Sequence, residues 1–94
     1  MAVLSKNKIA EKLKSVEGWN FENKQITKEY KFKDFISALD FLNKVGLAAE
    51  EMNHHPDLFL HSWNKLKISI STHSEGGVTE RDFKLAKKIE SLSK

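Results

Sequence analysis

Apolar and polar residues alternate most regularly over residues 66–73. The apolar or small members are Leu66, Ile68, Ile70 and Thr72, and the polar ones are Lys67, Ser69, Ser71 and His73. A period of two is typical of a β-strand that turns one face to a core and the other to solvent. This segment is therefore predicted to be a strand, with His73 on its polar face at the end.

Three other segments have strand character. Residues 26–32 also alternate, residues 19–21 contain two aromatic rings, and residues 58–63 form a short apolar-rich stretch. The polar residues 22–24 lie between the first two of these strands and are typical of a turn. Residues 19–21 and 26–32 are therefore predicted to pair as an antiparallel hairpin.

Two helices are predicted from their capping residues and the period of their apolar positions. Ser5 can cap a helix that runs to about Leu13, and Asp34 can cap a longer one. Pro56 is expected to end the longer helix, because the residue before a proline is disfavoured in the helical region. The apolar stripe of the longer helix is broad, which suggests packing on a sheet and also against another subunit.

A third helix completes the predicted fold. Thr79 and Asp82 resemble a capping box at its start, and Phe83, Ala86 and Ile89 are spaced to face inward. The order of elements is αββαββα, which predicts an α+β fold with a four-stranded antiparallel sheet and helices packed on one face. Residues 1–94 are expected to form a single domain, because this length leaves little room for a second core.

Composition and charge narrow the class of protein. The chain has no cysteine, which excludes disulfides and thiolate metal sites. The net charge is +3, but the basic residues are spread along the chain and Arg81 is the only arginine, so no nucleic-acid role is expected. No apolar run approaches the ~18 residues of a membrane span, and residues 1–7 lack the apolar region of a secretory signal. A soluble, cytoplasmic protein is expected.

Three histidines carry the candidate chemistry. His54 and His55 stand directly before the only proline, and His73 ends the amphipathic strand. Glu50 lies four residues before His54, so the two side chains can touch on one face of a helix. A carboxylate beside an imidazole fixes its tautomer and supports proton transfer near neutral pH. The pattern favours an acid–base site.

These residues by themselves leave other interpretations open. A single histidine is most often a surface polar residue, and His61, with no close acidic neighbour in the sequence, is best interpreted in that way. A metal site is disfavoured, because adjacent His54 and His55 would point about 100° apart around a helix and no HExxH motif is present. Trp19 and Trp63 fit either core positions or the wall of a pocket for a flat heterocycle.

A longer motif extends across the three histidines. Its members, with fixed spacings between them, are Glu50, His54, His55, Pro56, Trp63, His73 and Asp82. With this motif the sequence resembles the pterin-4a-carbinolamine dehydratases, which in mammals are also described as a dimerization cofactor of a homeodomain transcription factor. Further matches lie at Gly18-Trp19, Phe32-x-x-Phe35, Met52-Asn53 and Gly76-Gly77-Val78-Thr79, so the resemblance covers nearly the whole chain.

The resemblance implies a fold, an assembly and a reaction. The fold is αββαββα, and the assembly is a homodimer or homotetramer. The substrate would be a 4a-hydroxytetrahydropterin that loses water to give a quinonoid dihydropterin, with no metal or redox cofactor. An aromatic amino-acid hydroxylase would be the functional partner that produces this substrate.

The resemblance also implies roles for individual residues. His54 and His73 would be the catalytic histidines and His55 the pterin-contacting one, with Glu50 completing the catalytic set. Substrate contacts are expected from Asn53, His54, His55, Ser71, Thr72, His73 and Ser74, with Trp19 and Asp82 as further candidates.

The chemistry of the dehydration suggests how two histidines divide the work. Loss of hydroxide from C4a needs a general acid, and loss of the N5 proton needs a base. We expect His54, paired with Glu50, to protonate the leaving hydroxyl and His73 to act at N5, and the opposite assignment stays open. The alternative is an interaction module that docks its helices onto another protein without essential catalysis. Such a module has no need of the three histidines together.

Overall fold

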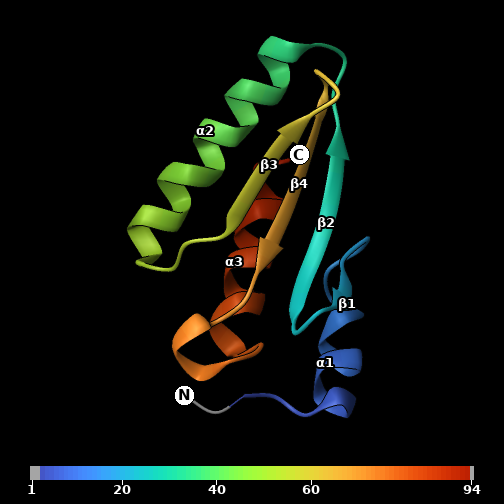
Figure 1. Cartoon of the computed structure of the whole chain (residues 1–94), viewed down its shortest axis with the longest axis vertical. Coiled ribbons are helices and arrows are strands. Elements are labelled where there is room, and N and C mark those ends of the chain that lie inside the picture. Colours follow the sequence, from blue (N-terminus) through green and yellow to red (C-terminus); the bar gives the residue numbers. More distant parts are fainter. Residues whose placement is uncertain (1–2, 94) are drawn as a thin grey trace.

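The computed structural model describes residues 3–93 and confirms the predicted order of helices and strands (Figure 1). The elements are α1 (Lys6–Leu13), β1 (Asn20–Glu22), β2 (Gln25–Lys31), α2 (Phe35–Met52), β3 (Asp57–His61), β4 (Lys65–Ile70), the 3-10 helix η1 (His73–Glu75) and α3 (Glu80–Leu92). The short helix η1 is an addition to the predicted αββαββα pattern.

The sheet is antiparallel, with the strand order β1-β2-β4-β3. β4 lies between β2 and β3, so that Ile68 pairs with Lys28 on one side and with Leu58 on the other. Leu66, Ile68 and Ile70 are fully buried, whereas the residues between them remain partly exposed. The most regular alternation in the sequence therefore belongs to β4, whose apolar face is fully buried.

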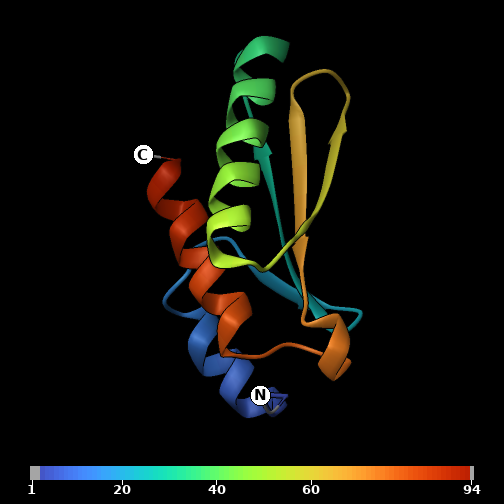
Figure 2. The ribbon, with the colours of Figure 1, turned by 90° about the vertical axis from the view of Figure 1, so that its left-hand side faces the viewer.

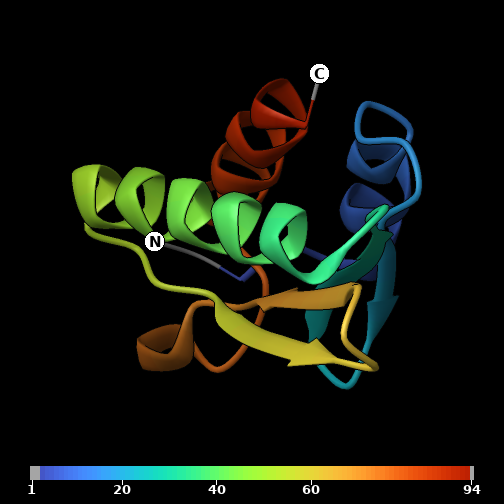
Figure 3. The ribbon, with the colours of Figure 1, turned by 90° about the horizontal axis from the view of Figure 1, so that it is seen from above.

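The helices cover one face of the sheet, as predicted from the sequence. In Figures 2 and 3, α1, α2 and α3 lie on the same side of the strands, and no element within residues 3–93 covers the other side. The core forms between these layers, where α2 contributes Phe41 and Val45 and α3 contributes Phe83 and Ile89. None of the helices in this part of the chain is long and apolar enough to cross a membrane.

The predicted helix starts are confirmed by their capping contacts. Ser5 Oγ accepts the Lys8 N–H at 3.2 Å, and Asp34 Oδ1 accepts the Ser37 N–H at 2.7 Å. A capping box closes the first turn of α3. In it the side chain of Thr79 accepts a backbone N–H of this turn, and the side chain of Asp82 accepts the backbone N–H of Thr79. These side chains satisfy N–H groups that have no partner inside the helix.

The end of α2 differs from the prediction. The helix does not run to Pro56 but ends at Met52, and Asn53 adopts a left-handed conformation with φ of 50°. Asparagine is among the residues that tolerate this conformation best, so the chain can turn here. The N–H groups of Asn53 and His54 still bond to carbonyls of the last helical turn. His54 and His55 therefore follow the helix instead of lying on its surface.

Two strands are also shorter than predicted. β3 ends at His61, because Ser62 and Trp63 take left-handed φ angles of 50° and 56° and reverse the chain. β4 ends at Ile70, and His73 therefore lies in η1, beyond the strand. The consequence is that the candidate histidines are presented by connecting segments held between regular elements.

Candidate active site

A pocket of about 220 Å³ lies where three segments of the chain meet. The segment after α2, the segment after β4 and the first turn of α3 contribute its lining residues: Asn53, His54, His55, Ser71, Thr72, His73, Ser74 and Arg81. The structure thus brings together the two segments that the sequence marked as a candidate site. They lie far apart in the sequence, and β3 and β4 connect them.

His54 is the most buried imidazole of the site and contacts a carboxylate on α3. Its side chain is only 8% exposed, and Nε2 lies 2.5 Å from Oδ1 of Asp82, whose side chain is 0% exposed. Asp82 was a candidate for substrate contact, but its complete burial places it behind His54, away from the open part of the pocket. Asp82 therefore contacts the pocket residue His54 but is not among the residues that line the pocket.

The Asp82 carboxylate is itself held by two further hydrogen bonds. Oδ2 accepts from the Thr79 backbone N–H at 2.8 Å and from Thr72 Oγ1 at 3.0 Å. Thr72 and Thr79 are buried, and their hydroxyl oxygens lie 2.8 Å apart. Such a fully connected buried network fixes the position of each member. The network joins the end of β4 to the first turn of α3 and holds His54 against both.

Glu50 contacts His55 and not His54, contrary to the prediction. Glu50 Oε1 lies 2.7 Å from Nε2 of His55, and the two side chains are 69% and 58% exposed. The predicted pairing assumed that the helix continued through His54, where residues four apart share a face. Because α2 ends at Met52, the chain turns and His54 points to Asp82. The site therefore contains one buried and one exposed imidazole–carboxylate pair.

His73 is the third imidazole of the pocket and is exposed to solvent in η1. Its turn is closed at the base by Thr72, whose N–H bonds to the Gly77 carbonyl at 2.8 Å. The N-terminal segment supports the same loop, because the Leu4 N–H bonds to the Val78 carbonyl at 2.8 Å. His73 is therefore an accessible side chain on a turn that is anchored at both ends.

Arg81 is a pocket residue that the sequence interpretation missed. It lies next to Asp82 in the first turn of α3, is half-buried, and donates from Nη2 to the Asn53 backbone carbonyl at 2.7 Å. The signal available in the sequence was that the only arginine of the chain precedes the last residue of the motif. Spacing rules give such an arginine no role, because its partner Asn53 lies 28 positions away in the sequence.

The candidate Trp19 lies outside the pocket, and so does His61, which was interpreted as a surface residue. Trp19 is 4% exposed, belongs to the hydrophobic core and is not among the residues that line the histidine pocket. His61 lies on the strand β3, where it bonds to Glu29 and stacks on Phe59 with ring centroids 4.8 Å apart. The interpretation of His61 as a residue outside the acid–base site agrees with this position.

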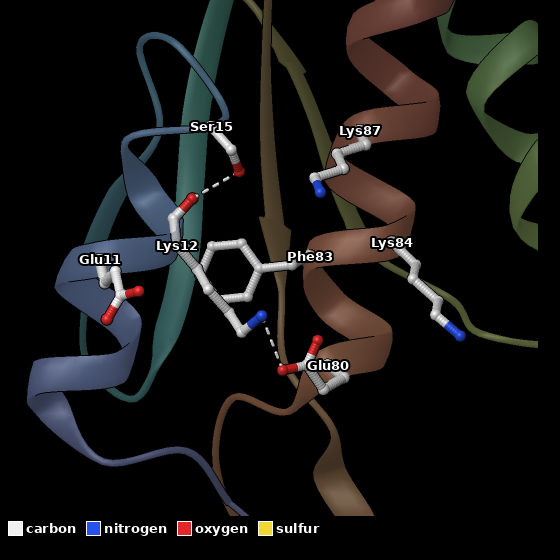
Figure 4. Close-up of a pocket in the computed structure, with 7 residues that line it drawn as sticks. All are labelled: Glu11, Lys12, Ser15, Glu80, Phe83, Lys84 and Lys87. Carbon is white, nitrogen blue, oxygen red and sulfur yellow. Dashed lines mark hydrogen bonds and ion pairs between the residues drawn. The ribbon is translucent and has the colours of Figure 1, made fainter.

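A second cavity, of about 320 Å³, opens between α1 and α3 (Figure 4). The side chains of Lys12 and Glu80 meet across it at 2.8 Å, and the ring of Phe83 lies between the two helices. It is larger than the histidine pocket, but its described lining holds no imidazole and its Glu80 is already paired with a lysine. For acid–base chemistry the histidine pocket is therefore the better candidate.

Within residues 3–93, no three His, Asp or Glu side chains are grouped so that they could hold a metal ion. The two carboxylates of the site each contact a different imidazole.

The chain matches one protein family over almost its full length. Residues 2–92 match the family described as "Pterin 4 alpha carbinolamine dehydratase". A protein of Sulfolobus acidocaldarius, provisionally named as a pterin-4-alpha-carbinolamine dehydratase, is 47% identical over 95% of this chain and 97% of its own length. A protein of Metallosphaera sedula with the same provisional name is 45% identical over 100% of this chain and 97% of its own length.

Solved structures show the same fold. A protein of Brucella melitensis described as a transcriptional coactivator/pterin dehydratase superimposes with a TM-score of 0.91 and 36% identity, over 98% of this chain and 99% of that one. A pterin dehydratase-like protein, described as a RuBisCO assembly factor of the alpha-carboxysome, superimposes with a TM-score of 0.65 over 80% of this chain and 86% of that one. At 16% identity the second match shows a shared fold alone.

Proposed function

Because the chain belongs to the pterin-4a-carbinolamine dehydratase family, we propose that it dehydrates a 4a-hydroxytetrahydropterin to the quinonoid dihydropterin. The observation that carries this proposal is the pocket in which His54, His55 and His73 meet, with His54 held by the buried carboxylate of Asp82. An arrangement of differently placed imidazoles around one small pocket suits a reaction that consists of two proton transfers.

The reaction requires one acid and one base and no change in oxidation state overall. The C4a–O bond breaks and the leaving hydroxide takes a proton from the acid, which gives water. The N5–H bond breaks, its electron pair forms the C4a=N5 double bond, and the proton goes to the base. One proton is supplied and one is taken up, so the enzyme returns to its starting state after proton exchange with solvent.

The contact between His54 and Asp82 suggests which nitrogen exchanges the proton. A carboxylate that already accepts from Thr79 and Thr72 is best matched by an N–H on Nε2 of His54. In the neutral ring, Nδ1 then carries the free lone pair and can accept a proton. Asp82 would stabilise the imidazolium that forms, as the buried carboxylate does in a Ser-His-Asp triad.

This geometry favours His54 as the base at N5, the reverse of the assignment expected from the sequence. His73 would then be the acid that protonates the leaving hydroxyl, since it lines the same pocket and its side chain is exposed, so that solvent can restore its proton. His55, paired with the exposed Glu50, would bind the heterocycle. Asn53, Ser71 and Ser74 would supply polar contacts around its edge.

Thr72 has a supporting role in this proposal. Its hydroxyl bonds to Asp82 and Thr79, its N–H bonds to Gly77, and its carbonyl accepts from Glu75 and Gly76. Its polar groups are therefore engaged within the protein, and it is 4% exposed. We assign Thr72 and Asp82 as positioning residues for His54.

The proposal is tested by the rate at which the purified protein dehydrates 4a-hydroxytetrahydropterin without added metal. His54→Ala and His73→Ala should each lower turnover by about 100-fold or more, in the range typical of general acid–base residues. His61→Ala is the matched control, because His61 lies on β3 outside the pocket. Near wild-type rates for both pocket variants would overturn the proposal.

One feature of α2 supports a second candidate role, in assembly. Ile36 and Leu47 are 63% and 69% exposed, and they lie about three turns apart on the same side of the helix. The side of α2 that packs on the sheet carries the buried residues Ala38, Phe41 and Val45 instead. We propose that the exposed side contacts a second copy of the chain, as expected for a homodimer or homotetramer.

The chemistry of the substrate also indicates its source. A 4a-hydroxytetrahydropterin arises when a tetrahydropterin delivers one oxygen atom of O₂ in a hydroxylation and keeps the other at C4a. We therefore propose a pterin-dependent hydroxylase, such as an aromatic amino-acid hydroxylase, as the functional partner that supplies it.

A further inference from the structure

Two consecutive residues of α3 hold two consecutive residues beyond α2. Arg81 donates from Nη2 to the Asn53 carbonyl at 2.7 Å, and Asp82 contacts Nε2 of His54 at 2.5 Å. Both contacts join residues 28 positions apart in the sequence. In the first turn of α3, Arg81 thus holds the backbone at Asn53, and Asp82 holds the imidazole of His54.

The two side chains differ in what they leave available to a ligand. Asp82 is completely buried, and three hydrogen bonds occupy its carboxylate. Arg81 is half-buried, lines the pocket, and uses one donor on Asn53. A guanidinium has five N–H donors in a rigid plane, so several remain for another acceptor.

Arg81 also differs electrostatically from its neighbours in the pocket. Among the described lining residues it is the side chain with a permanent charge, since the others are imidazoles, hydroxyls and an amide. A fixed cation with planar donors is suited to an oxygen acceptor on a flat ring, and it disfavours an amino group in the same place.

We propose that Arg81 is a specificity-determining residue that recognises the ring carbonyl oxygen of the heterocycle. The inference rests on the proposed function, because it assumes that the histidine pocket binds a pterin. A pterin carries a carbonyl at C4 of its pyrimidine ring, next to the C4a centre that reacts. Arg81 holds that oxygen and thereby sets the distance between C4a and the imidazoles of the pocket.

The test compares two ligands that differ in the substituent at C4 and, as a consequence, in the proton on the adjacent N3. 7,8-Dihydropterin has the carbonyl, and 2,4-diamino-7,8-dihydropteridine has an amino group there. Their dissociation constants are measured by fluorescence or calorimetry for the wild-type protein, Arg81→Met, Arg81→Lys and Lys84→Met. Methionine keeps an apolar stem without the charge, and Lys84 is an exposed residue of the same helix outside the histidine pocket.

The expected result is a loss of selectivity and not only of affinity. The wild-type protein and Lys84→Met should prefer dihydropterin, and Arg81→Met should lose about 10- to 100-fold of that preference, as expected for a hydrogen bond to a charged group. Arg81→Lys should recover part of it, because lysine keeps the charge without the planar fork.

A purely structural role for Arg81 gives a different pattern. If Arg81 only supports Asn53, Arg81→Met weakens both ligands by the same factor and the preference stays unchanged, which would overturn the inference. A wild-type protein that binds dihydropterin without preferring it over the diamino compound would also overturn the inference while leaving the proposed function intact. A wild-type protein that binds neither ligand would contradict the proposed function itself.

Discussion

One carboxylate oxygen of Asp82 lies 2.5 Å from Nε2 of His54, while the other accepts the backbone N–H of Thr79, the N-cap residue of α3. The residue that caps a helix therefore also positions the most buried imidazole of the pocket. Helix start and site geometry are coupled through a single side chain. A substitution that loosens the first turn of α3 should therefore also change the position of the His54 imidazole.

Replacing Asp82 by Asn tests this coupling. The amide keeps the size of the side chain but can present a donor to His54, which would favour the opposite tautomer. Turnover should fall by about 100-fold or more with a much smaller change in KM, as for other amides substituted behind a catalytic histidine. The helix cap also weakens, at a cost of about 1 kcal/mol in the free energy of unfolding. Steady-state kinetics well below the unfolding temperature separate the two effects.

Glu50→Gln is the matched comparison for Asp82→Asn. Glu50 and His55 are largely exposed, and exposed ion pairs contribute about 0–1 kcal/mol, so turnover should change by less than about 5-fold. A loss for Glu50→Gln equal to that for Asp82→Asn would contradict the assignment of Asp82 as the carboxylate that orients His54.

Gly77 is predicted to be a packing constraint between the N-terminal segment and the His73 loop. A Cβ at this position would lie 2.9 Å from Cγ1 of Val3. Gly77→Ala should therefore lower the free energy of unfolding by about 1 kcal/mol through overpacking, and adding Val3→Ala should restore most of the loss. Chemical denaturation of the two variants measures this.

Gly46→Ala is the control for the Gly77 substitution. Gly46 lies inside α2, and nothing lies within 4 Å of a Cβ built on it. Alanine should therefore stabilise the protein there, by about 0.5–1 kcal/mol, because its helix propensity is higher. If both glycine substitutions destabilise the protein equally, the Val3 contact is not the cause.

Glu90 should make the stability of the protein depend on pH in the acidic range. Burial by itself raises the pKa of Glu90, but hydrogen bonds from Lys28 and Tyr30 outweigh it and hold the pKa below its ordinary value of 4.5. A lowered folded-state pKa stabilises the protein above pH 4.5, and this contribution is lost as the pH falls through the folded-state value. Unfolding measured between neutral and acidic pH should show a smaller acid loss for Glu90→Gln than for the wild type.

Tyr30, which contacts Glu90, should make the stability of the protein fall as the pH rises in the alkaline range. Burial, followed by the hydrogen bond and charge of Glu90, raises the pKa of Tyr30 well above its ordinary value of 10.0. The neutral phenol therefore stabilises the fold below pH 10.0, and its contribution is lost as the pH rises beyond that. Tyr30→Phe removes this titration. An alkaline profile in Tyr30→Phe that is the same as in the wild type would argue against a raised pKa of Tyr30 in the folded protein.

The exposed side of α2 is predicted to carry the contact between copies of the chain. Ile36→Glu and Leu47→Glu together should shift the protein toward the monomer in sedimentation or light-scattering measurements, because the charges would be buried in the interface. Phe59→Glu places a charge on the exposed Phe59 of β3 instead and should leave the assembly intact. If Phe59→Glu dissociates the assembly and the α2 substitutions do not, the interface lies on the sheet and the prediction for α2 is wrong.

Local patterns in the sequence were sufficient for the fold but not for the contacts of the site. The alternation around Ile68 and the caps at Asp34 and Thr79 depend on near neighbours in the chain, so periodicity and capping rules could predict them. The partner of His54 depends on where α2 stops and on a residue 28 positions away, which no local rule contains. Pro56 was expected to end the helix, whereas the left-handed Asn53 ends it earlier.

In the capping box of α3, the contacts within the helix could be predicted from the sequence, but the contact with His54 could not. Thr79 and Asp82 were correctly expected to close the first turn of α3. Their local spacing could not show that the second oxygen of Asp82 faces His54, because that depends on how α3 packs against the end of α2. The same holds for Arg81, whose role depends on a contact with the distant Asn53 carbonyl.

The most direct test of the central claim is a crystal structure of the protein soaked with 7,8-dihydropterin. We predict that the bicyclic ring lies in the pocket of His54, His55 and His73, with the N5 edge toward Nδ1 of His54 and the imidazole of His73 near C4a. A ring bound elsewhere, for example in the cavity between α1 and α3, or bound without contact to His54 and His73, would contradict the account.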